Sequence, residues 1–353
     1  MTARYLVGDV FDGLGTLDDR SVDLVLTSPP FLALRSYLPA GHPDKGREIG
    51  SERTPADYLD AMLDVVEACA RVLAPHGSLV FELGDTYASS GGISDNRSES
   101  LGGNDFAPRG TRGHGVGWPL DKSLCMIPAL FAGSLAYGRN LLRPERTTDP
   151  WRVRNVVAWC RPNPPVGALG DKYRPGTSYL TVACKAKDRW FDLDAIRVPY
   201  SENSHPRMPQ GVEQLDGKGK SAQRDGRWST LPERDNDGAG APPLDWWEIP
   251  TEPYAGAHYA TFPERLVVRP ILSMCPERVC TVCGLPSRRI ETVGWSDCGH
   301  NSWRRGIVCD PFAGSGTTLA VAEGHGRDSI GIDLDARNAE LARERVGLWL
   351  TVS

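Results

Sequence analysis

Residues 306–334 read GIVCDPFAGSGTTLAVAEGHGRDSIGIDL, and this stretch decides the fold. An apolar run, a glycine-rich turn (311–318), an apolar helical segment and a second apolar run follow one another. This order of strand, turn, helix and strand is typical of a βαβ unit in a parallel sheet. We expect the glycines to let the backbone approach a ligand and a helix beginning at Thr317 or Thr318 to direct free N–H groups towards it. A further helix is expected over 335–350.

The glycine turn and the acid that follows it predict a nucleoside cofactor. Asp333 ends the second strand seventeen residues after Gly316, close to the spacing at which an acid hydrogen-bonds ribose hydroxyls. No Gly-Lys-Ser/Thr follows the turn, which excludes a P-loop. Asp310 would repel a pyrophosphate but suits an ammonium group or a hydroxyl. A cofactor with an adenosine end and a zwitterionic end fits best; the alternative is a plain tight turn.

Other apolar runs predict the rest of the sheet. The expected strands are residues 5–10, 22–27, 78–83, 153–160 and 177–184. A helix is expected over 57–73, opened by Thr54. No stretch approaches the ~20 apolar residues that span a bilayer, and the first residues lack a signal core. We therefore expect a cytoplasmic protein without a membrane partner.

Basic residues concentrate in one segment although the net charge is −5. Residues 139–189 hold eleven Lys or Arg against four Asp or Glu, an excess of seven positive charges. Such a segment suits a nucleic-acid contact face, because phosphate neutralisation supplies most non-specific affinity. A solvated surface is the alternative. The candidate phosphate partners are Arg154, Arg161, Lys172 and Arg174.

Two motifs together carry a family resemblance. Thr27-Ser-Pro-Pro-Phe31 follows an apolar run, and Asp310-Pro-Phe-Ala-Gly-Ser-Gly-Thr-Thr318 forms the glycine turn. Together they resemble the S-adenosylmethionine-dependent DNA amino-methyltransferases, and their order is similar to the β group, whose sheet is circularly permuted. Further matches are Gly8-Asp9 and residues 77–87, 154–165, 189–197 and 256–267. The resemblance implies an α/β fold, a circularly permuted, doubly wound Rossmann-like methyltransferase sheet with inserted loops.

Composition and the resemblance divide the chain into five regions. The long loops are predicted where Gly, Ser, Asn and charged residues replace any apolar period. The regions are a catalytic half (1–88), a flexible loop (89–120), a continuation of the sheet with the basic segment (121–200), a variable loop for target recognition (201–245) and a cofactor-binding half (246–353) with a cysteine insert (275–300).

The resemblance implies a role for each residue of the Ser-Pro-Pro-Phe motif. An exocyclic amino group is a poor nucleophile, because its lone pair is delocalised into the base. The Ser28 side chain and the Pro29 carbonyl accept its hydrogen bonds and localise that lone pair for in-line transfer. Pro29 and Pro30 stiffen the segment. Phe31 stacks on a base flipped out of the duplex. The alternative is a loop whose Phe31 belongs to the core.

The cofactor residues are likewise implied by the resemblance. It places the methionine end against the glycine turn, the ribose hydroxyls against Asp333 and the adenine amino group against Asp9. Thr261 and Phe262 belong to the element that covers the methionine moiety. Phe312 could instead pack, and Asp9 could cap a helix. The remaining expected cofactor residues are Thr27, Asp310, Phe312, Gly314, Gly316 and Thr317.

The first motif residue bears on the target base. Relatives with Ser at this position tend to methylate cytosine N4, whereas Asp or Asn is commoner in adenine-N6 enzymes. Some adenine enzymes also carry Ser, so cytosine N4 is favoured and adenine N6 stays open. The implied partners are double-stranded DNA and a cognate restriction endonuclease. An RNA or protein methyltransferase and a non-catalytic zinc-containing DNA-binding protein also stay open.

Four of the nine cysteines cluster with a histidine in the insert. The spacing Cys280-x2-Cys283-x14-Cys298-x-His300 suits a four-ligand zinc site, with Cys275 as a substitute ligand. The alternative is reduced thiols on an exposed loop. The odd number of cysteines indicates a reducing compartment rather than a disulfide framework. The other five are expected in the core: Cys69, Cys125, Cys160, Cys184 and Cys309.

Overall fold

A computed structural model describes most of the chain. The described residues are 2–34, 37–39, 41–88, 116–164, 170–200, 240–252, 262–290, 294–347 and 350–353. Their contacts separate a large unit, Met1–Asp192 with Asp245–Ser353, from a small one, Leu193–Leu244. In the small unit, a 3-10 turn (Asp194–Ile196) precedes a bridge between Val198 and Ala241. Most of the two predicted loops, residues 89–115 and 201–239, lies outside the described residues.

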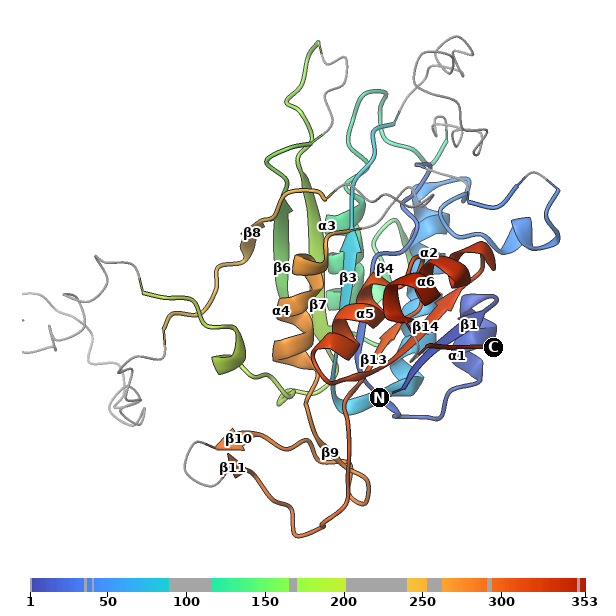
Figure 1. Cartoon of the computed structure of the whole chain (residues 1–353). Coiled ribbons are helices and arrows are strands. Elements are labelled where there is room, and N and C mark those ends of the chain that lie inside the picture. Colours follow the sequence, from blue (N-terminus) through green and yellow to red (C-terminus); the bar gives the residue numbers. More distant parts are fainter. Residues whose placement is uncertain are drawn as a thin grey trace, which may run out of the picture. The chain divides into compact units, whose positions relative to one another are not determined.

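A nine-stranded mixed sheet runs through the described part of the large unit (Figure 1). Its order is β15-β1-β14-β13-β2-β3-β7-β6-β8. Neighbours from β15 to β3 are parallel, and β7 lies antiparallel between β3 and β6. The bounds are β1 Ala3–Val7, β2 Val22–Thr27, β3 Leu73–Leu83, β6 Arg152–Cys160, β7 Thr177–Cys184, β8 Trp246–Glu248, β13 Ile307–Asp310, β14 Asp328–Asp333 and β15 Leu350–Val352.

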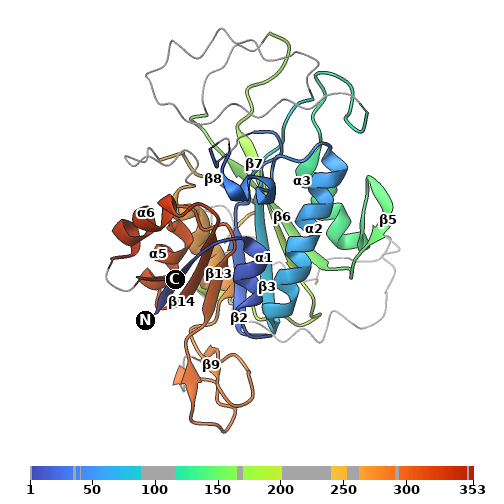
Figure 2. The same ribbon diagram turned by 90° about the vertical axis from the view of Figure 1, so that its right-hand side faces the viewer.

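Helices cover both faces of this sheet (Figures 1 and 2). One group is α1 (Val10–Gly15), α2 (Pro55–Val72) and α3 (Ile127–Tyr137). The other is α4 (Glu264–Met274), α5 (Thr317–Gly324) and α6 (Arg337–Val346). Short elements outside the sheet are a 3-10 helix (Pro43–Arg47) and three strand pairs: β4 Arg139–Asn140 with β5 Arg143–Thr147, β9 Val279–Cys280 with β12 Trp303–Arg304, and β10 Arg289–Ile290 with β11 Gly294–Trp295.

The sequence explains why these layers bury apolar surface. Every residue of β2, VDLVLT, is buried, as expected for a central parallel strand covered on both faces. Thr54 caps α2 by accepting from the Asp57 N–H at 3.2 Å, and Tyr58, Met62 and Leu63 turn the helix's apolar face into the core. The predicted helix and its cap are confirmed.

The two ends of the chain meet at the centre of the sheet. β13 and β14 from the C-terminal region lie between β1 and β2 from the N-terminal region. The α5 connection leads from β13 to β14 on one side, whereas α2 leads from β2 to β3 on the other. The doubly wound, permuted fold is therefore confirmed. Its topological switch point lies between β13 and β2, where open α/β sheets bind ligands.

Some predicted boundaries are wrong. The strand expected over 5–10 ends at Val7, because Gly8 adopts φ +153° and Asp9 is the N-cap of α1. The last helix ends at Val346, since Gly347 at φ +79° breaks it and the chain continues as β15. The helices α3 and α4 were not predicted. Among the described residues, no helix combines the length and apolar character that crossing a bilayer requires.

A buried ion pair fixes the end of the sheet where β2 begins. Asp23 is fully buried and accepts from the Arg304 guanidinium at 2.5 and 3.0 Å. The Ile307 N–H at 2.8 Å also donates to it, and His76 Nε2 lies 2.9 Å away. Burial alone would raise the pKa of Asp23, but the hydrogen bonds from His76 and Arg304 hold it below its usual value. This carboxylate therefore joins the starts of β2 and β13.

Candidate functional site

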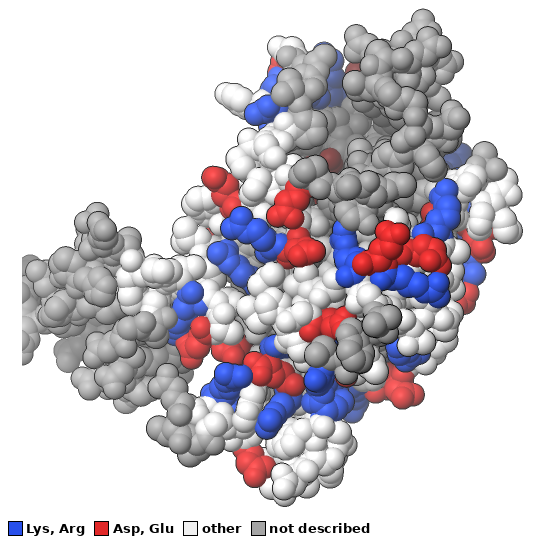
Figure 3. Space-filling view, in the orientation of Figure 1, with Lys and Arg blue, Asp and Glu red and all other residues white. Residues whose placement is uncertain are grey.

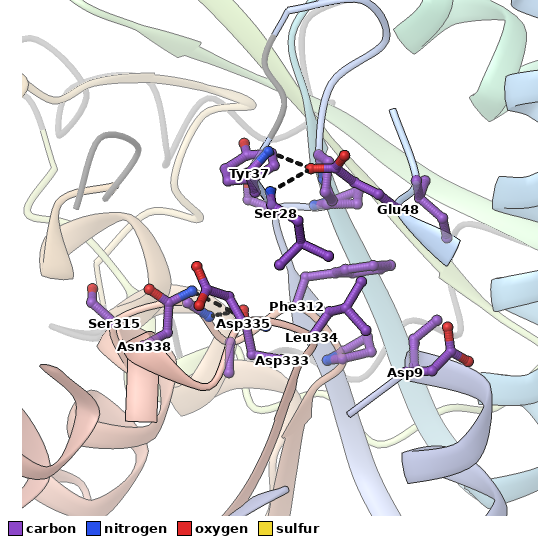
Figure 4. Close-up of a pocket in the computed structure, with 18 of the residues that line it drawn as sticks. Asp9, Ser28, Tyr37, Glu48, Phe312, Ser315, Asp333, Leu334, Asp335 and Asn338 are labelled. Atoms are coloured by element: carbon purple, nitrogen blue, oxygen red, sulfur yellow. Dashed lines mark hydrogen bonds between the residues drawn. The ribbon is translucent and has the colours of Figure 1, made fainter. Parts of the chain in front are cut away.

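A pocket opens at the carboxyl ends of β1, β2, β13 and β14. It is lined by the chain that follows each strand, including Asp9, Ser28, Phe312 and Asp333. In the view of Figure 4, Phe312 lies between Ser28 and Asp333. The Ser-Pro-Pro-Phe motif and the glycine turn, separated by almost the whole chain, thus share one cavity. This is the crevice that the switch point predicts.

Ser28 is held by a buried acid that the sequence analysis missed. Its hydroxyl donates to Glu82 Oε2 at 2.6 Å, and Glu82 on β3 is 4% exposed. Burial raises the pKa of Glu82, while hydrogen bonds from Ser178 and Ser28 and the charge of Arg161 lower it. Because the Ser28 proton points at Glu82, the lone pairs of the Ser28 oxygen remain to accept. A lone acid inside the apolar run 78–83 was the only sequence signal.

Contacts with neighbouring elements fix the rest of the motif. The Tyr58 hydroxyl donates to the Pro30 carbonyl at 2.9 Å. A Cβ added at Gly84 would lie 2.6 Å from the Phe31 ring, so the ring occupies the space that a side chain there would need. Gly50, at φ +98°, packs against Pro30 and Phe31. Phe31 is half-buried at the pocket wall, as a stacking surface requires.

The glycine turn joins β13 to α5 and is tied to Asp333. Gly314 donates its N–H to Asp333 Oδ2 at 2.8 Å, and its carbonyl accepts from the Tyr5 hydroxyl at 2.7 Å. Gly316 caps α5 at φ +77°, and a Cβ there would lie 3.0 Å from Ala342 on α6. Two features thus require glycine at 316, the left-handed backbone and the close approach of the helices. Gly314 and Thr317 line the pocket, whereas Gly316 does not.

Asp310 lies behind the pocket wall rather than in it. It is 1% exposed and accepts from the hydroxyls of Thr27 at 2.5 Å and Thr318 at 2.6 Å and from the Phe312 N–H at 3.1 Å. Burial raises the pKa of Asp310 to about 6, against these hydrogen bonds. Thr27 and Asp310 do not line the pocket. The expectation of direct cofactor contact is therefore not supported for Thr27, Asp310 and Gly316, because protein groups surround them.

Asp9 both lines the pocket and caps α1. Its Oδ1 accepts from the Phe11 N–H at 2.9 Å, and Arg47 lies 3.4 Å away. Asp333 is half-buried, and its Oδ1 accepts from the Asp335 N–H and from Asn338 Nδ2, each at 2.9 Å. Burial raises the pKa of Asp333. Both predicted acids thus face the cavity with part of their hydrogen-bonding capacity used by the protein.

Other lining residues were not predicted. Asp335 and Asn338 follow β14 and line the pocket. Glu48 also lines it, and its Oε1 accepts hydrogen bonds from the N–H of Leu38 at 3.1 Å and from that of Tyr37 (Figure 4). The sequence gives little indication of these three residues, since none belongs to a recognisable motif. Phe262 lines the pocket and packs on the core, whereas Thr261 lies outside the described residues.

The four predicted phosphate partners do not lie together. Arg161 follows β6, and Lys172 and Arg174 precede β7, so these three lie at the pocket end of the sheet. Lys172 stacks on Tyr87 at 3.5 Å, and Arg174 is exposed. Arg154 lies towards the other end, where its guanidinium donates to the Lys187 carbonyl and to Cys184 Sγ. Arg154 is therefore not placed for the same DNA contact.

Part of the basic segment neutralises α2. Arg143 pairs with Asp57 at 2.7 Å and with Asp60, and Arg146 pairs with Asp64 at 2.5 Å. On the face drawn in Figure 3, basic and acidic side chains of the described residues are interspersed. The charge excess of residues 139–189 therefore overstates the basic surface available to DNA.

The structure also brings the predicted metal ligands together. Ligand atoms of Cys280, Cys283, Cys298 and His300 all lie within 4.8 Å of one another. Cys275 does not belong to this cluster, because its side chain is fully buried in the core on the α4 side. It is wrong as a substitute ligand. The other cysteines are buried as expected, except that Cys160 is half-buried.

Known proteins with similar sequences are methyltransferases. The family described as DNA methylase matches residues 22–344. The type II methyltransferase M.SmaI of Serratia marcescens is 26% identical over 98% of this chain and 91% of its own. M.Cfr9I of Citrobacter freundii is 24% identical over 98% and 87%.

Solved structures share the fold. The PvuII DNA methyltransferase (cytosine-N4-specific) has a TM-score of 0.56 at 14% identity, covering 97% of this chain and 86% of its own. A protein of Thermus thermophilus, solved as a complex with S-adenosyl-L-methionine, has a TM-score of 0.50 at 20% identity, covering 99% of each chain. With the family model spanning most of its length, the chain belongs to the DNA methylase family, the S-adenosylmethionine-dependent amino-methyltransferases that its two motifs resemble.

Proposed function

We propose that this chain methylates the N4 amino group of a cytosine flipped out of duplex DNA. The observation that carries the proposal is the Ser28 hydroxyl, which is directed at Glu82 in a pocket shared with the glycine turn. A target amino group beside Ser28 would thus lie across the same cavity from Asp333. S-adenosylmethionine, when bound, supplies the electrophilic methyl group.

The residues of this chain prepare the amino group for that attack. Ser28 Oγ and the Pro29 carbonyl would accept its two N–H groups, which holds the nitrogen lone pair away from the ring and towards the cavity. Glu82 keeps the Ser28 hydroxyl in the accepting orientation. The raised pKa of Glu82 also suits it to receive, through Ser28, the proton that the amino nitrogen loses on methylation. Phe31 would stack on the base.

Cofactor positioning follows from the opposite wall. We propose that Asp333 binds the ribose hydroxyls and Asp9 the adenine amino group, while Phe312, Gly314, Thr317 and Phe262 surround the methionine end. A carboxylate that lines a cavity suits both hydroxyl and amino donors. Thr27, Asp310 and Gly316 would not contact the cofactor. They would instead fix the conformation of the glycine turn from behind the pocket wall.

Cytosine is favoured over adenine by Ser28 itself. A hydroxyl is a weaker acceptor than the carboxylate or amide that is commoner in adenine-N6 enzymes. The PvuII enzyme is named as cytosine-N4-specific, but at 14% identity its likeness concerns the fold. Adenine N6 is the second candidate. The DNA itself would contact Arg161, Lys172 and Arg174 at the pocket end of the sheet, and a restriction endonuclease of the same specificity would be the cytoplasmic partner.

The product identifies the base. Purified protein is incubated with unmethylated bacterial DNA and S-adenosylmethionine, the DNA is digested to nucleosides, and these are identified by mass spectrometry. We expect N4-methylcytosine. N6-methyladenine would keep the mechanism and change the base.

Ser28→Ala is the matched variant for this experiment. It should lose about 10²- to 10³-fold in kcat, as when one preorganised hydrogen-bonding group is removed, with unchanged cofactor affinity by calorimetry. Full activity of Ser28→Ala would refute the assigned site. If the wild-type protein binds S-adenosylmethionine but yields no methylated nucleoside, DNA is not its substrate.

A further inference from the structure

We propose that Cys280, Cys283, Cys298 and His300 bind one structural zinc ion. This inference is independent of the proposed methylation, because none of the four residues lines the pocket. The donors are three thiols and one imidazole, the set that structural zinc sites use.

The distances between these donors suit a tetrahedral ion. Two sulfurs that are each about 2.3 Å from one zinc ion lie about 3.8 Å apart at the tetrahedral angle. Cys298 Sγ lies 3.6 Å from His300 Nδ1, and all four ligand atoms lie within 4.8 Å of one another. Small side-chain rotations would therefore complete the coordination shell.

The backbone around Cys280 is folded for a metal-bound thiolate. The N–H groups of Val282 and Cys283 point at Cys280 Sγ, at 3.4 and 3.5 Å. Gly284 adopts φ +70° directly after Cys283, so the chain turns back at that point. Backbone donors aimed at one sulfur suit a metal ligand, because they hydrogen-bond the coordinating sulfur and fix its direction.

A metal would also replace a missing core. Three apolar side chains of the cysteine insert face solvent: Val282 is 65% exposed, Leu285 57% and Ile290 40%. The two-residue pairs β9–β12 and β10–β11 are too short to hold a loop of this size alone. Beyond Val279 and Cys275, the described part of the insert thus brings together metal-binding donors while much of its apolar surface stays exposed, as expected when a metal supplies folding energy.

The site lies at the end of the sheet remote from the pocket. The insert leaves α4 and returns at Ile307, where β13 begins, whereas Asp310 ends that strand near the glycine turn. Figures 1 and 2 both show β9 beyond the starting end of β13. Arg304, at the end of the β9–β12 pair, forms the ion pair with Asp23. Zinc would therefore hold the insert on the start of the sheet without contacting the reacting groups.

The test measures metal in the full-length chain, purified without a metal-binding tag. Elemental analysis should find about one zinc per chain. The double variant Cys283→Ser/Cys298→Ser should lose it, be cut faster by protease within the insert, and keep its S-adenosylmethionine affinity within about twofold, since distant sites act independently. Cys160→Ser, a half-buried cysteine outside the cluster, is the matched control and should keep its zinc.

A second measurement separates ligand loss from misfolding. Cobalt substituted into the wild-type chain should show the visible absorption of a tetrahedral thiolate site. His300→Cys should retain one metal ion with a shifted cobalt spectrum, because a fourth thiolate replaces the imidazole. The proposal is overturned if the folded, cofactor-binding chain takes up no zinc or if the double variant retains it. It is also overturned if two of these cysteines form a disulfide in protein purified with reductant.

Discussion

Buried carboxylates occupy opposite electrostatic settings at the two ends of the sheet. Where β2 begins, Asp23 pairs with Arg304 and His76, and its pKa lies below the usual value. At the pocket end, Glu82 and Asp310 accept hydrogen bonds from hydroxyls, and neither forms an ion pair within the described part of the chain. Burial raises the pKa of both.

This difference separates a structural end from a reactive end. A carboxylate paired with a cation stays ionised at ordinary pH, and the cation balances its charge. Its role is to join strands. A buried carboxylate without an ion-pair partner destabilises the fold, yet its raised pKa lets it take up a proton more readily than an exposed carboxylate does. At the pocket end, buried carboxylates thus lower the stability of the fold but can take part in proton transfer. At the other end, the paired carboxylate of Asp23 stabilises the fold and does not titrate in the ordinary pH range. Substitutions at the two ends should consequently change different measurable quantities.

The largest effect is expected at the structural end. Asp23→Ala removes the carboxylate that pairs with the half-buried Arg304 guanidinium and accepts from the Ile307 N–H. Breaking a buried ion pair from one side costs about 3–5 kcal/mol, so urea unfolding should show a loss of that size. The exposed pair between Arg343 and Glu340 supplies the control, since Glu340→Ala should cost less than about 1 kcal/mol. Equal losses in the two variants would contradict the role given to Asp23.

The sequence predicted those parts of both ends that depend on neighbouring residues. The strand before Ser28, the glycine turn and the start of α5 each follow from a short local pattern, and they are found where expected. The Ser28 to Glu82 hydrogen bond joins residues 54 positions apart, and the Asp23 to Arg304 pair joins residues 281 apart. Such contacts depend on which strands are neighbours and on their register.

The same limit explains the errors in single residues. Glu82 looks like an ordinary acid in a strand until β3 is placed beside β2. Gly84 carries no signal of its own, because its contact is the ring of Phe31. Arg154 and Arg161 are seven residues apart in the sequence, but a nine-residue strand sends them towards opposite ends of the sheet. The number of charged residues in a segment therefore does not show on which part of the surface those charges lie.

An intermediate effect is expected for Asp310→Asn, and its sign depends on pH. The pKa of Asp310 is raised from 3.8 to about 6, so its carboxyl stabilises the fold below pH 4 and loses that contribution as the pH rises through 6. Asparagine does not ionise. Between pH 4.5 and 7.5, the unfolding free energy of the variant should therefore rise relative to that of wild type by roughly 2 kcal/mol. A difference that stays constant over this range in urea titrations would show that Asp310 is not buried as an uncompensated charge.

The smallest effect, and the one that tests the reactive end most directly, is expected for Glu82→Gln. Glutamine still offers an oxygen to the Ser28 hydroxyl, but it carries no charge and takes no proton, so kcat should fall about tenfold. In wild type, the raised pKa of Glu82 should give kcat an acidic limb, because protonated Glu82 donates to Ser28 and occupies a lone pair that the amino group needs. Measured at saturating cofactor, this limb should be absent in the variant. An unchanged limb would assign the titration to another group and reduce Glu82 to a packing residue, whereas its loss would show that the pocket end keeps its buried charge for the transfer step.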